Sequence, residues 1–204
     1  MPIQNTPSYT FSLNTTTTPL HVNELVDACV LFIDMQDFTQ FTCNKSDKAI
    51  VQALHYCYCL FDNIITKFSA RPIKYNGDAC IILLETGNNC FPSNIENSLY
   101  LYNTLAKAFS ELCELYNVQS ALRAGLAFGP VLSGQIGSYI SSFDIWGHTV
   151  NLAARLEQNA PPNSLLMNKA CHDRMLNPCL CEGITLELKG FVPQQVYQYH
   201  KREP

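Results

Sequence analysis

Charge is scarce in this 204-residue chain, and long apolar runs are missing from it. Charged residues make up only 15% of the sequence, no basic run occurs, and the formal net charge is −4. This balance argues against broad nucleic-acid binding and against docking on an acidic membrane surface. No apolar run approaches the ~20 residues that a membrane-spanning helix needs. We therefore expect neither a nucleic acid nor a membrane as a partner.

The first residues also lack the basic and apolar regions of a secretory signal, which bears on the ten cysteines. In a secreted protein so many cysteines would suggest a disulfide framework. Here Cys29, Cys57, Cys80 and Cys113 lie inside apolar periodic segments. We expect them to be reduced and buried as small hydrophobic side chains, in a cytoplasmic protein.

Hydrophobic residues make up 47% of the chain, which predicts a globular protein with a sizeable core. Residues 1–22 are rich in Ser, Thr, Asn and Pro and predict a flexible N-terminal arm. Residues 23–204 are expected to form one catalytic domain.

Strand and helix patterns alternate along this domain. Apolar runs, spacing of three and four, and turn residues predict strands at Cys29–Ile33, Ala121–Phe128, Val131–Ile136, Ser164–Met167, Thr185–Leu188 and Val196–Tyr199, a hairpin at Ile73–Leu84, and helices at about 47–68, 94–116, 150–159 and 169–175. The capping box Ser93–Glu96 marks the start of the second helix. This order predicts an α/β sandwich with a ferredoxin-like βαββαβ core, extended by C-terminal strands and short helices.

Two aspartates stand at the ends of predicted strands. Asp34 closes the apolar run that begins at Cys29, and Asp78 follows the Asn76-Gly77 turn. If these strands are neighbours, both carboxylates point at one place and are suited to hold two divalent cations. Backbone N–H groups of the turn at Phe38-Thr39 are suited to phosphate oxygens. The alternative is that both aspartates are ordinary turn residues, although an aspartate has few structural reasons to close so apolar a strand.

A second polar group follows downstream. Asn151 and Arg155 are four residues apart on a predicted helix, so they share a face, and a guanidinium there suits a transferring phosphoryl group. The alternative is a surface arginine that pairs with Glu157 or caps a turn. Lys74 can donate to a nucleotide base edge and Asp144 can accept from one, or both are solvated charges.

Lys189, Trp146 and His148 lie near these motifs or follow them. Lys189, next to Gly190, is suited to contact a phosphate, or is a surface lysine. Trp146 is expected to pack under the strand that carries Asp144, and His148 is expected to be structural.

Together these segments resemble the catalytic domain of class III nucleotidyl cyclases, the family of adenylate and guanylate cyclases. The resemblance runs from about Cys29 to Tyr199. It rests on the ordered motifs Phe32–Thr39, Ile73–Asp78, Arg123–Gly137, Phe143–Arg155 and Leu188–Gly190.

The resemblance implies a metal site and a reaction centre. Asp34 and Asp78 would hold two Mg²⁺ or Mn²⁺ ions per active site. One ion would lower the pKa of the ribose 3′-hydroxyl, and the other would bridge the β- and γ-phosphates of the leaving pyrophosphate. Asn151 would orient the ribose, and Arg155 would stabilise the pentacovalent transition state.

The resemblance also implies how the substrate is bound. Lys74 and Asp144 match the base-reading pair of adenylate cyclases, whereas guanylate cyclases carry Glu and Cys there. Phe38, Thr39 and Lys189 would contact the triphosphate. Because metal-binding and transition-state residues come from different subunits in this family, a head-to-tail homodimer with two interface sites is expected.

The expected activity is adenylate cyclase, which converts ATP to 3′,5′-cyclic AMP and pyrophosphate. Two alternatives stay open. Tyr75 beside Lys74 would narrow the base pocket, and stand-alone members of the family include anti-phage enzymes that make cyclic CMP or cyclic UMP. A pyrimidine cyclase acting on CTP or UTP is therefore one alternative. A catalytically inactive, dimerising regulatory domain is the other.

Overall fold

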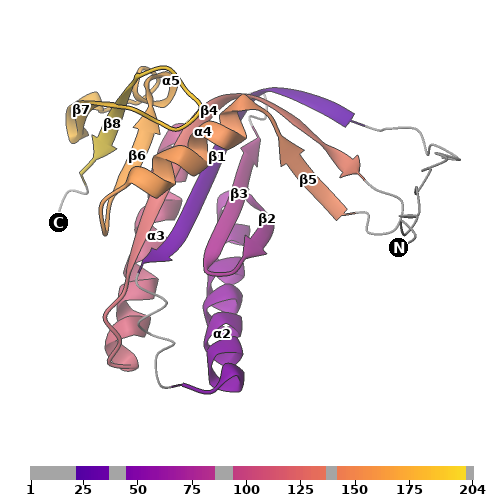
Figure 1. Cartoon of the computed structure of the whole chain (residues 1–204), viewed down its shortest axis with the longest axis vertical. Coiled ribbons are helices and arrows are strands. Elements are labelled where there is room, and N and C mark those ends of the chain that lie inside the picture. Colours follow the sequence, from indigo (N-terminus) through magenta and orange to yellow (C-terminus); the bar gives the residue numbers. More distant parts are fainter. Residues whose placement is uncertain (1–21, 37–44, 86–93, 137–141, 201–204) are drawn as a thin grey trace, which may run out of the picture.

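The structure is a computed structural model that describes residues 22–36, 45–85, 94–136 and 142–200. In these ranges a mixed sheet has the strand order β2-β3-β1-β4-β6-β8-β7, and β5 pairs with β4 (Figure 1). The strands are β1 (Val22–Gln36), β2 (Arg71–Asn76), β3 (Ala79–Glu85), β4 (Ala121–Ile136), β5 (Ser142–Trp146), β6 (Leu165–Asn168), β7 (Cys181–Leu186) and β8 (Gln194–Tyr199). The helices are α2 (Asp47–Ile65), α3 (Asn94–Leu115), α4 (His148–Asn159) and α5 (Lys169–His172), with short 3-10 turns η1 (Thr66–Phe68) and η2 (Pro178–Leu180).

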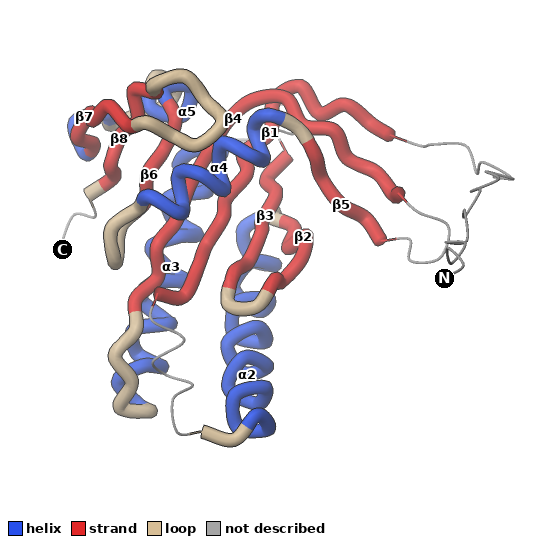
Figure 2. The backbone as a smooth tube through the Cα atoms, in the orientation of Figure 1, coloured by secondary structure: helices blue, strands red, loops and turns tan. Residues whose placement is uncertain are grey.

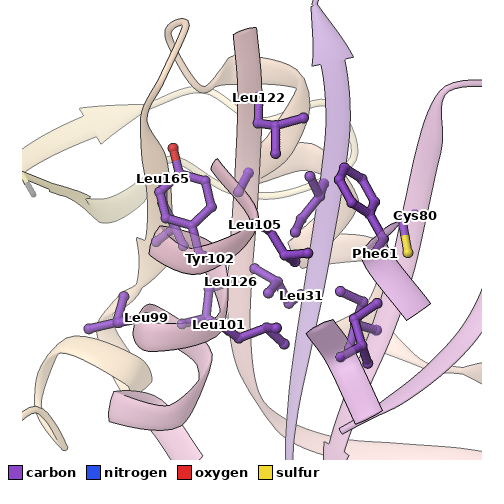
Figure 3. Close-up of a cluster of buried hydrophobic side chains, with 14 of the residues drawn as sticks. Leu31, Phe61, Cys80, Leu99, Leu101, Tyr102, Leu105, Leu122, Leu126 and Leu165 are labelled. Atoms are coloured by element: carbon purple, nitrogen blue, oxygen red, sulfur yellow. The ribbon is translucent and has the colours of Figure 1, made fainter. Parts of the chain in front are cut away.

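Helices cover both faces of the sheet. In Figure 1, α4 crosses the front of β1 and β4, whereas α2 and α3 lie on the other side. Figure 3 shows the core between the sheet and these two helices, where Phe61 of α2 and Leu105 of α3 join Leu31 of β1. A second core, beneath α4, contains Val30 of β1.

Alternation along β1 assigns each residue to one of these faces. Leu31, Ile33 and Met35 belong to the core under α2 and α3, while Ala28 and Val30 belong to the core under α4. Because successive side chains of a strand point to opposite faces, Asp34 points to the α4 face.

The predicted fold class is confirmed. The elements β1, α2, β2, β3, α3 and β4 follow one another in the predicted βαββαβ order, and the remaining strands and short helices come after them. Ser46 caps α2 by accepting a hydrogen bond from the backbone N–H of Ala49 at 3.3 Å. The predicted capping residue of α3, Ser93, lies outside the described residues. So does the predicted arm, except that Val22 already belongs to β1.

The prediction of two strands separated by Gly129-Pro130 is wrong, because β4 runs without interruption through both residues. The partner strand β1 shifts its register between Leu25 and Ala28, opposite this dipeptide. Such a bulge leaves room for a proline that cannot donate a ladder hydrogen bond. The strand therefore bends there instead of ending.

The bend separates a second part of the sheet from the core. Beyond it, the end of β4, the beginning of β1 and the whole of β5 extend to the right in Figure 2. Thr149 of α4 donates to the carbonyl oxygen of Pro130 at 2.7 Å. A Cβ atom at Gly129 would lie 2.7 Å from the same hydroxyl oxygen, so glycine allows α4 to begin directly against the bend.

The four cysteines expected in the core are all buried, and the described cysteines are free thiols. Burial raises the pKa of Cys29 and Cys80 to about 12, so these thiols are protonated and behave as apolar side chains. Across the described ranges, no helix combines the length and the apolar character needed to cross a bilayer.

Candidate active site

The aspartates predicted to share cations lie close together. Asp34 on β1 is opposite Ala79 of β3, and Asp78 comes immediately before Ala79 in the turn that leads into β3. Burial raises the pKa of Asp78, and the charge of Asp34 adds to the rise. A carboxyl group whose ionisation is disfavoured by burial and by a neighbouring negative charge forms part of a site that a cation would stabilise.

Arg123 is a member of this site that the sequence analysis did not identify. On β4 it lies directly opposite Asp34 of β1. Its Nε and Nη2 both donate to Asp34 Oδ2, at 3.0 and 2.8 Å. The sequence shows an arginine in the otherwise apolar run of β4, which could have indicated a functional residue. Its partner, Asp34, follows only from the register of β1 and β4.

Glu157 of α4 contacts the same guanidinium. Its Oε1 lies 2.8 Å from Arg123 Nε, and its side chain is only 8% exposed. Burial is the main cause that raises the pKa of Glu157 to about 7; Arg123 opposes the rise, and Asp34 and Asp78 add to it. The alternative pairing of Arg155 with Glu157 is therefore wrong. Arg155 Nη1 instead donates to Gln158 Oε1 at 2.6 Å.

The raised pKa of Glu157 predicts a stability that depends on pH. Between its ordinary value of 4.5 and about 7 the folded chain retains a proton that the unfolded chain has lost. Stability must therefore fall as pH rises through this window. The free energy of unfolding of the wild type should fall between pH 5 and pH 8. We expect this fall to be ~2 kcal/mol smaller in Glu157→Gln.

Urea unfolding in EDTA at both pH values measures this difference. Glu111→Gln is the matched control, because that carboxylate is 65% exposed beside Lys107, and its stability should follow the wild-type chain. Parallel pH profiles for Glu157→Gln and wild type would show that the buried carboxyl group does not titrate as described.

The predicted base-reading residues form an ion pair. Lys74 Nζ of β2 lies 2.6 Å from Asp144 Oδ2 of β5. Nearby, the Arg71 guanidinium lies 3.6 Å from the ring centroid of Phe143, a cation–π contact. These two contacts hold the β5 extension beside β2. The lysine side chain remains 47% exposed, so the pair is accessible to a ligand.

Tyr75 does not line this region, contrary to the expectation that its ring narrows the base pocket. Lys74 is paired with Ile81 and Tyr75 with Cys80, which belong to the cores on opposite faces of the sheet. The Tyr75 ring stacks on Tyr58 of α2 with centroids 3.9 Å apart. Its hydroxyl donates to Asp62 Oδ1 at 2.6 Å. Tyr75 is therefore a core residue under α2.

Helix α4 carries the predicted reaction-centre residues on its outer side. Leu152 and Leu156 are buried against the sheet. Asn151 is exposed and Arg155 is half-buried, and their spacing of four places them one turn apart.

Lys189 is presented by a tight turn near the start of α4. The N–H of Phe191 donates to the carbonyl oxygen of Leu188 at 3.0 Å, and Gly190 has φ +86°, which is typical of a type II turn. Leu188 is buried, and the Phe191 ring meets the His148 ring with centroids 4.7 Å apart. His148 is exposed, and the structural role expected for it stays a prediction. Lys189 itself is exposed.

The expectations for Trp146 and for the predicted phosphate-contacting residues Phe38 and Thr39 have the following outcomes. Trp146 belongs to β5 itself, the strand that carries Asp144, so it does not pack under that strand. Phe38 and Thr39 lie outside the described residues.

Comparison with known proteins identifies the family. The model of the adenylate and guanylate cyclase catalytic domain matches residues 20–199. The chain belongs to this family. It is 31% identical over 135 residues to the germination-specific adenylate cyclase of Dictyostelium discoideum, covering 64% of this chain and 16% of that protein. It is 29% identical over 149 residues to a receptor-type guanylate cyclase of Caenorhabditis elegans, and this match covers 72% of this chain and 14% of that protein.

Solved cyclase domains share the fold. The adenylyl cyclase CyaB from P. aeruginosa superposes with a TM-score of 0.78 at 19% identity, covering 90% of this chain and 98% of that one. The guanylate cyclase domain of RhGC from Catenaria anguillulae, in complex with GTP, superposes with a TM-score of 0.77 at 20% identity. The match covers 89% of this chain and 100% of that one. The chain is thus a class III nucleotidyl cyclase domain, and both adenylate and guanylate cyclases are among its relatives.

The cyclase domain has a carboxylate pair that fits divalent metal ions. In its described part, no cluster of three or more His, Cys, Asp or Glu side chains forms a complete metal cage. Mg²⁺ does not need one, since it is commonly held by one or two carboxylates together with substrate phosphates. The negative charge that Asp34 places beside Asp78 suits such an incomplete site.

A cavity elsewhere in the cyclase domain is separate from this site. It has a volume of about 240 Å³ and an apolar lining from α2, α3 and the adjoining strand ends, including Met35, Cys57, Phe109 and Cys113. None of the described residues predicted for catalysis, substrate or metal lies in its wall. These residues instead belong to the α4 side of the sheet and to its β5 extension.

Proposed function

We propose that this cyclase domain is an adenylate cyclase that converts ATP to 3′,5′-cyclic AMP and pyrophosphate. The observation that carries this proposal is the 2.6 Å pair of Lys74 and Asp144. The edge of adenine offers an acceptor at N1 and a donor at the 6-amino group, which an ammonium and a carboxylate complement. The resemblance supports the same choice, because guanylate cyclases have Glu and Cys at these positions.

Exchange of this pair tests the base preference. We expect Lys74→Glu with Asp144→Cys to lower kcat/KM for ATP by ~10²-fold or more, because the substrate's polar edge loses its partners. The value for GTP should rise. Both are measured from initial rates with each triphosphate in Mn²⁺.

Tyr75→Phe is the matched control for this exchange. It removes only a hydroxyl that contacts Asp62 on the α2 face, so the preference for ATP should stay unchanged. A changed preference in Tyr75→Phe, or an unchanged one in the double exchange, would contradict the proposed base-reading pair.

The reaction proposed is attack of the ribose 3′-oxygen on the α-phosphorus, with pyrophosphate leaving. Mg²⁺ or Mn²⁺ at Asp34 and Asp78 would supply Lewis-acid activation of the attacking hydroxyl and neutralisation of the leaving phosphates. Asn151 donates to and orients the ribose. The Arg155 guanidinium stabilises the charge that develops on the α-phosphoryl oxygens, and the Lys189 ammonium binds the phosphates.

A head-to-tail homodimer would bring these groups together. Among the described residues, no ion pair joins Arg155 to Asp34 or to Asp78, and Arg155 contacts Gln158 of its own helix. Asp34 points toward the sheet side of α4, where Glu157 lies, whereas Asn151 lies on the outer side of that helix. This separation supports an active site to which one subunit contributes the carboxylates and the other contributes the amide and guanidinium.

A four-nucleotide assay decides among the alternatives. The purified chain is incubated with Mn²⁺ and ATP, GTP, CTP or UTP, and the products are separated by chromatography. Cyclic AMP as the main product supports the proposal. Turnover of CTP or UTP alone would favour the pyrimidine cyclase. Tyr75 no longer argues for that alternative, because its ring packs under α2 and does not narrow the base pocket. A stable dimer without any product would favour an inactive regulatory domain.

A further inference from the structure

Arg123, which is half-buried, and Glu157, which is buried, form a pair beside Asp34 that the proposed reaction does not use. Arg123 donates through Nε and Nη2 to Asp34 Oδ2, and its Nε lies 2.8 Å from Glu157 Oε1. The exposed side-chain fractions are 13% for Asp34, 28% for Arg123 and 8% for Glu157. One guanidinium therefore contacts two carboxylates, one on β1 and one on α4.

The position of Glu157 is costly for the fold. The Nε hydrogen is directed at Asp34, so Glu157 Oε1, although close, receives no directed hydrogen bond within the described structure. A buried carboxylate with an incomplete set of hydrogen bonds is destabilising. An amide or apolar side chain would serve stability as well or better, which points to a role beyond folding.

The pair constrains the direction of the Asp34 carboxylate. Both nitrogens of Arg123 donate to the same oxygen, Oδ2, so the guanidinium restrains the position of this one oxygen with two charge-assisted hydrogen bonds. The contacts of Arg123 with Asp34 are all with Oδ2, so they leave the other oxygen, Oδ1, able to bind a cation.

Glu157 in turn holds Arg123 from a rigid element. Helix α4 lies very close to β4, because a Cβ atom at Gly125 would collide with the carbonyl oxygen of Ala153 and the backbone nitrogen of Glu157. The backbone of Glu157 is thus held directly above the strand that carries Arg123.

We propose that Glu157 is a positioning residue for the metal site and acts through Arg123. It draws part of the guanidinium charge toward α4, so that Arg123 orients Asp34 without neutralising it fully. This inference rests on the proposed function only in assuming that Asp34 and Asp78 bind a divalent cation. Without Glu157, Arg123 would pair with Asp34 alone and compete with the cation.

Titration of the full chain with Mn²⁺ by calorimetry, without nucleotide, tests this role. We expect Glu157→Gln to raise the Mn²⁺ dissociation constant by ~3- to 10-fold, the range of coupling between contacting side chains. Glu111→Gln, on the exposed side of α3, should bind as the wild type does. If Glu157→Gln fails to fold, Arg123→Lys provides a second variant. A single ammonium cannot bridge two carboxylates as a guanidinium does, and the constant should rise again.

A double-mutant cycle tests whether Glu157 affects Mn²⁺ binding through Arg123 or through its own charge acting directly on the cation. In an Arg123→Gln background, Glu157→Gln should change the dissociation constant by less than about twofold, because the intermediary is gone. An equal effect in both backgrounds would mean that Glu157 acts directly on the cation, and it would overturn the proposal.

The remaining outcomes distinguish this inference from the proposed function. Wild-type binding of Mn²⁺ that is lost in Asp78→Asn and unchanged in Glu157→Gln would overturn the positioning role alone. Wild-type binding that is insensitive to Asp78→Asn, or no binding at all, would overturn the proposed metal site together with the role of Glu157.

Discussion

Replacement of Asp78 with Asn is expected to lower the turnover of ATP by ~10³-fold or more, because a divalent cation supplies several kcal/mol of transition-state stabilisation. The amide has nearly the same shape as the carboxyl group but offers a much poorer metal ligand. Initial rates at saturating ATP and Mn²⁺ measure the effect.

Stability provides an internal check on this variant. The pKa of Asp78 is raised by burial and by the charge of Asp34, so removal of its charge should relieve repulsion. The free energy of unfolding of Asp78→Asn in EDTA should equal or exceed that of the wild type at neutral pH. Asp173→Asn is the matched control, since that aspartate is 45% exposed and pairs with Lys169. Near-normal turnover in Asp78→Asn would refute the metal role.

Arg155→Ala is expected to lower kcat by ~10²-fold with little change in KM, because the guanidinium acts mainly on charge that develops in the transition state. In the structure Arg155 donates to Gln158 at 2.6 Å, which suggests a competing explanation through the local structure of α4.

Gln158→Ala separates the two explanations. It removes the partner of Arg155 on the helix surface but leaves the guanidinium in place, so kcat should stay within about twofold of the wild type. A loss in Gln158→Ala as large as that in Arg155→Ala would indicate a local structural effect. A rise in KM without a fall in kcat would indicate substrate binding.

Much of the fold was predictable because its signals are local. The apolar stripe of α2, the Asn76-Gly77 turn and the continuous apolar run of β1 each depend on residues within one segment. Their order was enough to predict the βαββαβ core. The bend at Gly129-Pro130 was misread, because a proline breaks a strand or only bends it according to whether the partner strand bulges. The partner segment, Leu25–Ala28, is remote in sequence.

The candidate site likewise has features that local sequence predicts and features that depend on contacts between remote segments. The positions of Asp34 and Asp78 at strand ends could be read from the sequence, and their proximity follows from β1 and β3 being neighbours. The contacts of Arg123 could not be read, because they depend on its register opposite Asp34 and on the close approach of α4 above Gly125. Tyr75 was misassigned for a related reason. Adjacent residues of a strand point to opposite faces, and only the packing of α2 determines which face receives the tyrosine.

The shared active site is tested most directly by mixing two inactive variants. Asp78→Asn chains keep Asn151 and Arg155, and Arg155→Ala chains keep both aspartates. A heterodimer of the two would therefore contain one complete site. With random pairing, half of the dimers are mixed and each has one of two sites intact, so activity should recover to about a quarter of the wild-type value. No recovery, in a mixture in which heterodimers are demonstrated by differently tagged chains, would contradict a site built from two subunits.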